Sequence, residues 1–185
     1  MLEIDTEKKV RAELAIEPMA LKHLAEVYAI EVSVYPHPWP LKSFADEVAR
    51  NQYAHYYVST IEGKVVGYVG MWVFLDEAHI TNIAVAHGYR RRKIGERMLV
   101  HVLDLAMRLG ANSVYLEVRR HNFAAQRLYS RYLFKSDGVR ERYYADNSED
   151  AVVLRIRTLR SEEFAGRFRE NTERLKQWAA APAAD

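Results

Sequence analysis

The residue types with the clearest chemical meaning lie in a cationic turn between an apolar strand and a helix. Arg90, Arg91, Arg92 and Lys93 place four cations in a row, and Gly95 follows them without a side chain. A strand that runs into a helix presents free backbone N–H groups and the positive end of the helix dipole. We interpret the turn as a pyrophosphate site for an acyl-carrying cofactor. The alternative is a solvated basic turn that only connects two core elements.

Glu117 is a candidate base because it interrupts an apolar strand. The apolar residues of 114–118 share one face of this strand, which leaves Glu117 on the other face. In a sheet that helices cover on both sides, a carboxylate on that face would be buried. Burial of a charge is unfavourable, so the carboxylate must have a partner or a function. The alternative is a structural carboxylate that pairs with Arg119 or Arg142 near the end of the strand.

Tyr129 is a candidate acid on a helix. It shares one helical stripe with Ala125, Leu128 and Tyr132, which indicates a core tyrosine with a hydrogen-bonded hydroxyl. A phenol with a pKa near 10 is also suited to protonating a thiolate. Asn122 stands where its side chain would cap the same helix.

Composition bounds the remaining possibilities. The chain has 185 residues, 49% apolar and 28% charged, with a net charge of only +2, so no overall field favours nucleic acid. The absence of cysteine excludes disulfides, thiolate metal sites and a cysteine nucleophile. Neither a signal peptide nor a run of about 18 apolar residues is present. We therefore expect a cytoplasmic protein that does not enter a membrane.

Metal and hydrolase chemistry have no support in the motifs. The chain has no G-x-S-x-G elbow, no P-loop and no H-E-x-x-H spacing. Its seven histidines are scattered, and we interpret each as a surface or core residue. We therefore expect no bound metal.

Hydrophobic periodicity predicts a mixed α/β fold, in which a largely consecutive central sheet is flanked by helices. The expected strands cover residues 10–16, 53–61, 65–74, 78–86, 113–118, 134–143 and 151–157. The expected helices cover residues 19–32, 41–50, 94–109 and 122–132, with Pro18 tolerated in the first turn of the first helix.

The composition changes after residue 157, which divides the chain into an expected domain at 10–157 and an extension at 158–185. A possible helical stripe in the extension predicts an appended helix that packs on the domain or on a partner. The stripe contains Leu159, Phe164, Phe168, Leu175 and Trp178. A partly disordered basic tail is the alternative.

Four motifs in order carry a resemblance to a known family. The strand ITNIAV, the turn YRRRKIG, the strand YLEVRRHN and the helix AAQRLY resemble the GNAT superfamily of acetyl-CoA-dependent N-acetyltransferases. Within it, LDEAHITNIAV, LEVRRHNFAAQRLY and YYADNSEDA resemble bacterial ribosomal-protein-alanine N-acetyltransferases of the RimI type. The match spans residues 15–157 and implies the GNAT acyl-CoA N-acyltransferase fold.

One position departs from the family pattern. Lys93 stands where the turn of the family usually has its first glycine. A lysine at this position keeps the backbone N–H group that binds a phosphate. If φ is positive there, however, the side chain destabilises the turn by roughly 1 kcal/mol relative to glycine. We expect Lys93 to lie in the first turn of a right-handed helix, where this cost vanishes.

The resemblance also implies roles for individual residues. It makes Glu117 the proton acceptor and Tyr129 the proton donor of acetyl transfer, and it lets Asn122 touch the cofactor. Trp39, in a loop with three prolines, and Tyr143 with Tyr144 are expected to wall the peptide entry. The resemblance further implies that the pantetheine arm binds the backbone groups of Ile83, Ala84 and Val85. It implies that the pyrophosphate binds the turn residues Arg90, Arg91, Arg92, Lys93, Ile94 and Gly95.

The expected activity is therefore transfer of acetyl from acetyl-CoA to a protein N-terminus, the alanine of a small-subunit ribosomal protein. An α-amine has a pKa of about 7.7 to 8.0, so roughly a tenth is neutral at pH 7 and a modest base is enough. Two alternatives stay open: a GNAT enzyme for lysine side chains or small amines, and a non-catalytic acyl-CoA-binding module. The sequence leaves self-association open and predicts no direct contact with nucleic acid.

Overall fold

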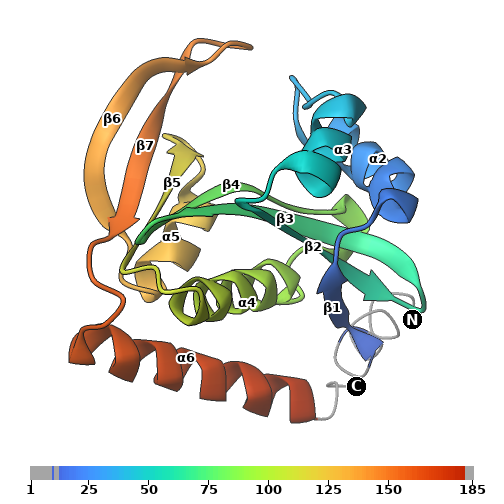
Figure 1. Ribbon diagram of the computed structural model, residues 1–185. Helices are drawn as coiled ribbons and strands as arrows, with labels where there is room; N and C mark the ends of the chain where they lie inside the picture. The colour runs from blue at the N-terminus through green and yellow to red at the C-terminus, as the bar shows by residue number, and fades with distance from the viewer. Residues whose placement is uncertain (1–9, 11–12, 182–185) are drawn as a thin grey trace.

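A seven-stranded mixed sheet forms the centre of the molecule (Figure 1). The computed structural model describes residues 10 and 13–181. The order of the strands is β1-β2-β3-β4-β5-β7-β6, and every neighbouring pair is antiparallel except the parallel pair β4 and β5. The strands are β1 (Ala15–Pro18), β2 (Ala54–Ile61), β3 (Lys64–Phe74), β4 (Glu77–Val85), β5 (Ser113–Arg119), β6 (Lys135–Tyr144) and β7 (Glu149–Ile156).

Helices cover both faces of this sheet, as Figure 1 shows. The core on one face contains residues of α4, α5 and α6, and the core on the other contains residues of α2 and α3. The helices are η1 (Leu21–His23), α2 (Leu24–Val34), α3 (Leu41–Arg50), η2 (His87–Tyr89), α4 (Ile94–Arg108), α5 (Phe123–Arg131) and α6 (Glu162–Ala180). The predicted mixed sheet with flanking helices and a C-terminal helix is confirmed.

Burial follows the sequence pattern on the central strands. β3 is buried continuously from Val65 to Met71, as expected for a strand that lies between helices on both faces. On β5 the burial alternates, with Val114, Leu116 and Val118 inside. The prediction that Glu117 lies on the opposite face of β5 is therefore confirmed.

The N-terminal part of the sheet differs from expectation. The strand expected at 10–16 is wrong in its extent, because Val10 and Glu13 are helical and β1 begins only at Ala15; residues 11–12 lie outside the described part. Pro18 belongs to β1, where it stands opposite Tyr57, rather than to the first helical turn. β1 is an edge strand, the position in a sheet where proline is tolerated because no second neighbour needs its N–H group.

The pairing of β4 with β5 ends early. It runs from Glu77 opposite Ser113 to Ile80 opposite Leu116, although β4 continues to Val85 and β5 to Arg119. Within the described part of the chain, no β5 residue pairs with the last part of β4. The end of β4 therefore presents backbone groups without a strand partner on this side.

The described helices include none that is long and apolar enough to cross a membrane.

Candidate functional site

The turn before α4 has a left-handed backbone at two residues. Arg91 has a φ of 65° and Lys93 a φ of 60°, and Lys93 is the N-cap of α4 rather than part of its first turn. The right-handed conformation expected at Lys93 is therefore wrong. Such a conformation costs roughly 1 to 2 kcal/mol per residue with a side chain, and left-handed residues help to build concavities of backbone N–H groups that bind anions.

The helix start supplies further donors. The first i to i−4 bond of α4 runs from the N–H of Arg97 to the carbonyl of Lys93 at 2.9 Å. The N–H groups of Ile94, Gly95 and Glu96 precede this bond, so they have no helical carbonyl to bind. These amides stand at the positive end of the helix dipole, where an anionic group is favoured.

Two of the four cations hold the turn in shape. The Nε group of Arg90 donates to the carbonyl of Val85 at 3.2 Å, and Nη1 of Arg92 donates to the carbonyl of Gly88 at 2.7 Å. These guanidinium groups are therefore partly bound to the turn itself. The side chain of Arg91 is exposed.

The register of β4 with β3 decides which backbone groups face β5. Ala86 N–H donates to the Val66 carbonyl at 2.9 Å, which fixes the alternation of the antiparallel ladder. Ala84 lies two residues earlier, so its N–H and C=O groups point toward β3. Ile83 and Val85 are the neighbours of Ala84 in the strand. Their backbone N–H and C=O groups therefore point in the opposite direction, toward the side of β5. This register supports a ligand contact for the backbone of Ile83 and Val85, and it does not support one for the backbone of Ala84.

Side chains already bind the carbonyls on that side. The hydroxyl of Tyr35 donates to the carbonyl of Ile83 at 3.0 Å, and Arg90 binds the carbonyl of Val85. A ligand that lies along the end of β4 would therefore use the N–H groups of Ile83 and Val85.

Glu117 follows directly after the last β5 residue that pairs with β4. Its side chain is 6% exposed, and its Oε2 lies 2.7 Å from Nε2 of His79. Nη2 of Arg140 lies 2.9 Å from Oε1 of Glu117. The alternative of a structural pair with Arg119 or Arg142 is not what the structure has, because the two partners come from β4 and β6.

These neighbours set the charge of Glu117. Burial by itself would raise the pKa of this carboxyl, but the hydrogen bond with His79 and the charges of His79 and Arg140 outweigh it and lower the pKa below its ordinary value. Glu117 is therefore ionised at neutral pH. As a carboxylate, it attracts an ammonium group and accepts hydrogen bonds.

Tyr129 reaches the site from α5. It is 4% exposed, and burial raises its pKa above the ordinary range, so the phenol keeps its proton at neutral pH. The expected helix cap is present, because Oδ1 of Asn122 accepts the N–H of Ala125 at 3.1 Å. Tyr129 is thus both the core tyrosine that the helical stripe predicts and a potential proton donor.

Tyr144 connects the surroundings of Glu117 and Tyr129. Burial, opposed by the charge of Arg119, raises the pKa of Tyr144 to about 12, and the charge of Glu117 adds to the increase. Tyr144 in turn acts on the pKa of Tyr129. Burial also raises the pKa of Tyr35, with smaller effects of Tyr129 and Tyr144. Tyr144 is thus within electrostatic reach of Glu117 on β5, of Tyr129 on α5 and of Tyr35, the residue that follows α2.

The two expected wall residues differ in their surroundings. Trp39 packs at 5.8 Å from the ring of Phe44, and its backbone N–H donates to Oε1 of Glu31 at 2.8 Å. Tyr143 is 45% exposed, stands edge-on to Tyr144 at 5.2 Å, and has its pKa raised by burial and then by the charge of Glu117. Tyr143 is therefore beside the carboxylate, whereas Trp39 is largely a core residue that anchors its loop.

Comparison with known proteins decides the family. The model of the acetyltransferase (GNAT) family matches residues 24–133. The chain belongs to this family. It is 38% identical over 145 residues, 78% of this chain and 96% of the relative, to a candidate ribosomal protein bS18-alanine N-acetyltransferase of Bacillus subtilis. It is 33% identical over 143 residues, 76% of this chain and 95% of the relative, to the ribosomal protein bS18-alanine N-acetyltransferase of Escherichia coli.

Solved structures agree with the family. The crystal structure of the ribosomal-protein-S18-alanine N-acetyltransferase from Escherichia coli has a TM-score of 0.73 and 31% sequence identity, and it covers 80% of this chain and 97% of that chain. The protein is therefore an acyltransferase with the GNAT fold. Its resemblance to the RimI type, noted from the motifs, is confirmed.

Sequence reasoning missed several residues of this GNAT site. His79 was one of seven scattered histidines, yet it lies opposite Tyr115 in the parallel pairing and stacks on that ring at 4.2 Å. Tyr115 and Glu117 share a face of β5, so His79 lies beside Glu117. Recognition of the β4 and β5 pairing would have found it. Arg140 gives no such signal, because β6 reaches Glu117 only through β7.

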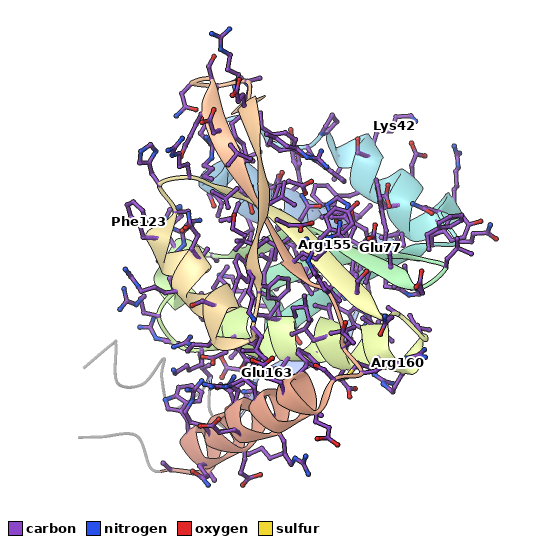
Figure 2. All side chains as sticks on the ribbon, turned by 90° about the vertical axis from the view of Figure 1, so that its left-hand side faces the viewer. Lys42, Glu77, Phe123, Arg155, Arg160 and Glu163 are labelled. Carbon is purple, nitrogen blue, oxygen red and sulfur yellow. The ribbon has the colours of Figure 1, made fainter. Side chains whose placement is uncertain are left out.

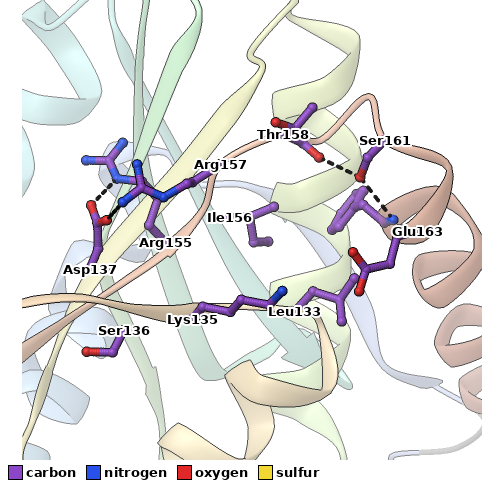
Figure 3. A pocket seen from close by; sticks show the side chains of 11 residues that line it. Leu133, Lys135, Ser136, Asp137, Arg155, Ile156, Arg157, Thr158, Ser161 and Glu163 are labelled. Carbon is purple, nitrogen blue, oxygen red and sulfur yellow. Dashed lines mark hydrogen bonds and ion pairs between the residues drawn. The ribbon is translucent and has the colours of Figure 1, made fainter.

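A recess lies away from this site. It encloses about 250 Å³ between the β6–β7 ribbon and the start of α6 (Figure 3). Its charged groups bind one another: Nε of Arg155 lies 2.7 Å from Oδ2 of Asp137, and Arg155 also pairs with Glu77, beside which it lies in Figure 2. In the described part of the chain, no group of His, Asp and Glu side chains could hold a metal ion.

Proposed function

We propose that this GNAT enzyme transfers the acetyl group of acetyl-CoA to the α-amine of a protein N-terminus. The substrate we propose is the N-terminal alanine of a small-subunit ribosomal protein, because the Escherichia coli relative is a ribosomal protein bS18-alanine N-acetyltransferase. The observation that carries the proposal is that an ionised carboxylate, Glu117, and a protonated phenol, Tyr129, both lie within electrostatic reach of Tyr144, with Glu117 directly after the last β5 residue that pairs with β4.

The backbone would hold the acyl donor. The N–H groups of Ile83 and Val85 stand along the end of β4, and an extended pantetheine arm can bind there as an added strand would. The amides from Lys93 to Gly95 and the cationic side chains of the turn are suited to the diphosphate. The N–H of Val85 is also placed to polarise the thioester carbonyl, which accepts negative charge during attack.

The side chains divide the proton transfers. The neutral amine forms a C–N bond to the thioester carbon, and the C–S bond then breaks. Because the pKa of Glu117 is low, Glu117 attracts the ammonium form beforehand and acts as a weak base, which accepts the proton once attack has made the amine nitrogen acidic, directly or through a water molecule. Tyr129 donates its proton to the sulfur as the C–S bond breaks, and the proton held by Glu117 returns to the phenolate through solvent. His79 and Arg140 keep Glu117 ionised.

A peptide panel tests this function. Peptides that begin with alanine, serine or methionine, and one with a blocked N-terminus and an internal lysine, are incubated with acetyl-CoA, and mass spectrometry locates the acetyl group. We expect modification of the α-amine, with the alanine peptide preferred. Acetylation of the lysine alone would favour the enzyme class that acts on side chains. Binding of acetyl-CoA without any transfer would favour a non-catalytic module.

A further inference from the structure

The C-terminal helix α6 lies across α4 on the same face of the sheet (Figure 1). Phe164 is 1% exposed and belongs to the same core as residues of α4 and α5, and Phe168 packs against that core. Asn171 is buried, and its side chain donates to the backbone carbonyl of Arg131 at 2.7 Å. The helix is therefore fixed in register against the elements that carry the proposed diphosphate turn and Tyr129.

A buried carboxylate lies where these elements meet. Glu96 is 3% exposed and occupies the first turn of α4, directly after Gly95. Its Oε1 accepts from Nη2 of Arg174 at 2.7 Å and from the hydroxyl of Tyr132 at 3.1 Å. Its Oε2 accepts from Nη2 of Arg131 at 3.3 Å and from Nζ of Lys93 at 3.4 Å.

Of the cations around Glu96, that of Arg174 is the closest. A buried carboxylate is stable only when a cation or several donors compensate its charge. If Arg174 were absent, Arg131 and Lys93 would have to supply that charge. Lys93 is also the N-cap of α4, directly before the free amides of the proposed diphosphate site, and its backbone there is left-handed. A diphosphate bound at the turn would compete with Glu96 for the ammonium group of Lys93, and the pairing of Arg174 with Glu96 would favour the ligand.

We propose that Arg174 is a positioning residue for the acyl donor. By pairing with Glu96 it neutralises an anion next to the diphosphate turn, leaves Lys93 to the ligand, and holds the start of α4 in place. This inference rests on the proposed function, because it takes the diphosphate of coenzyme A as the ligand of the turn. It gives the C-terminal extension a role in donor binding, although its residues lie beyond the matched family segment 24–133.

The test compares two substitutions on α6. Arg174→Met removes the charge but keeps an unbranched stem that can fill the same space. Arg167→Met is the matched control, because Arg167 is similarly exposed, 49% against 47%, and pairs only weakly with Glu170 of its own helix, at 3.7 Å. We expect Arg174→Met to raise the Kd of coenzyme A, measured by calorimetry, roughly tenfold, which corresponds to about 1.4 kcal/mol. Arg167→Met should leave the Kd unchanged.

Two further measurements separate positioning from a general structural effect. Arg174→Met should raise KM for acetyl-CoA and leave kcat unchanged, and it should not affect kcat/KM for S-acetyl-N-acetylcysteamine, a thioester donor without a diphosphate. The double variant Arg174→Met with Glu96→Gln should regain the affinity of the unchanged protein for coenzyme A, because the buried charge is gone.

The results that would overturn the inference are distinct from failure of the proposed function. An unchanged Kd in Arg174→Met, an equal loss of activity with the truncated donor, or no recovery with Glu96→Gln would each refute the role of Arg174. The proposed function is judged separately, by whether the unchanged protein acetylates the peptide panel.

Discussion

At the scale of single residues, the proposed chemistry depends on environments that hold each group in one protonation state. Glu117 is buried but ionised, because His79 and Arg140 outweigh the effect of burial on its pKa. Burial raises the pKa of Tyr129, and among the described residues no cation acts on it to favour the phenolate. An anionic acceptor and a neutral donor are the pair that acyl transfer to an amine needs.

Glu117→Gln should lower kcat by roughly 10²- to 10⁴-fold, the usual contribution of a general base, with little change in the Kd of coenzyme A. Tyr129→Phe should have the same signature. Steady-state kinetics with the alanine peptide and calorimetry with coenzyme A measure the two quantities. Glu141→Gln, at an exposed position of β6, is the control. Weaker donor binding at unchanged kcat would mean that the assigned roles are wrong.

The left-handed backbone of Lys93 gives a second prediction at this scale. Lys93→Gly relieves the strain of a side chain in this conformation, whereas Lys93→Ala removes the same charge and keeps the strain. We expect the glycine variant to be more stable than the alanine variant by about 1 kcal/mol in urea unfolding. Equal stabilities would argue against a strained turn in solution.

At the scale of elements, the β6–β7 hairpin is fastened to the end of β5 by a network of charges. Nη2 of Arg119 lies 2.9 Å from both carboxylate oxygens of Asp146, and Nη1 lies 3.2 Å from Oε2 of Glu149. The same guanidinium group lies 3.9 Å from the ring centre of Tyr144. The network therefore holds the strand end that carries Tyr143 and Tyr144 next to Glu117.

This network predicts a pH dependence of stability. The hydrogen bond from the backbone N–H of His121, together with the side chains of Arg119, His121 and Asn147, lowers the pKa of Glu149 to about 2. A carboxyl with a depressed pKa stabilises the fold above its unfolded pKa, and the contribution disappears as the pH falls through the folded pKa. The stability difference between the unchanged protein and Glu149→Gln should therefore be full above about pH 5 and vanish near pH 2. Urea unfolding across this range measures it, and a constant difference would contradict the prediction.

At the scale of the whole molecule, α6 is joined to the rest of the protein by one continuous core. Leu159 and Phe164 are buried with residues of α4 and α5, and Phe168 and Trp178 pack against the same core. The helix predicted from the stripe thus packs on the rest of the described chain.

Phe164→Ala should lower the free energy of unfolding by roughly 3 to 5 kcal/mol, the usual effect of removing a buried aromatic ring. Phe123→Ala is the control, because Phe123 is 58% exposed and its loss should change the free energy by no more than about 0.5 kcal/mol. Unfolding should also follow a single transition by fluorescence and circular dichroism. Separate loss of helix signal before the main transition would show that α6 unfolds on its own.

The sequence by itself determined which elements form and which faces they bury. Alternation placed Glu117 away from the core, helical spacing placed Tyr129 inside it, and the stripe after residue 157 predicted α6. These features are local, since they depend on side-chain periodicity within one segment. The bounds of most helices and strands therefore agree with expectation to within two or three residues.

Only the tertiary structure decided which residues meet. His79 and Arg140 contact Glu117 because of the strand pairing. Lys93 has a left-handed backbone where the chain turns from strand to helix. Arg174 binds Glu96, which lies 78 positions earlier in the chain. Such contacts depend on register and on the order of strands in the sheet, which periodicity does not contain. Charges on the surface of separate elements become partners of a buried carboxylate only when the core brings those elements together.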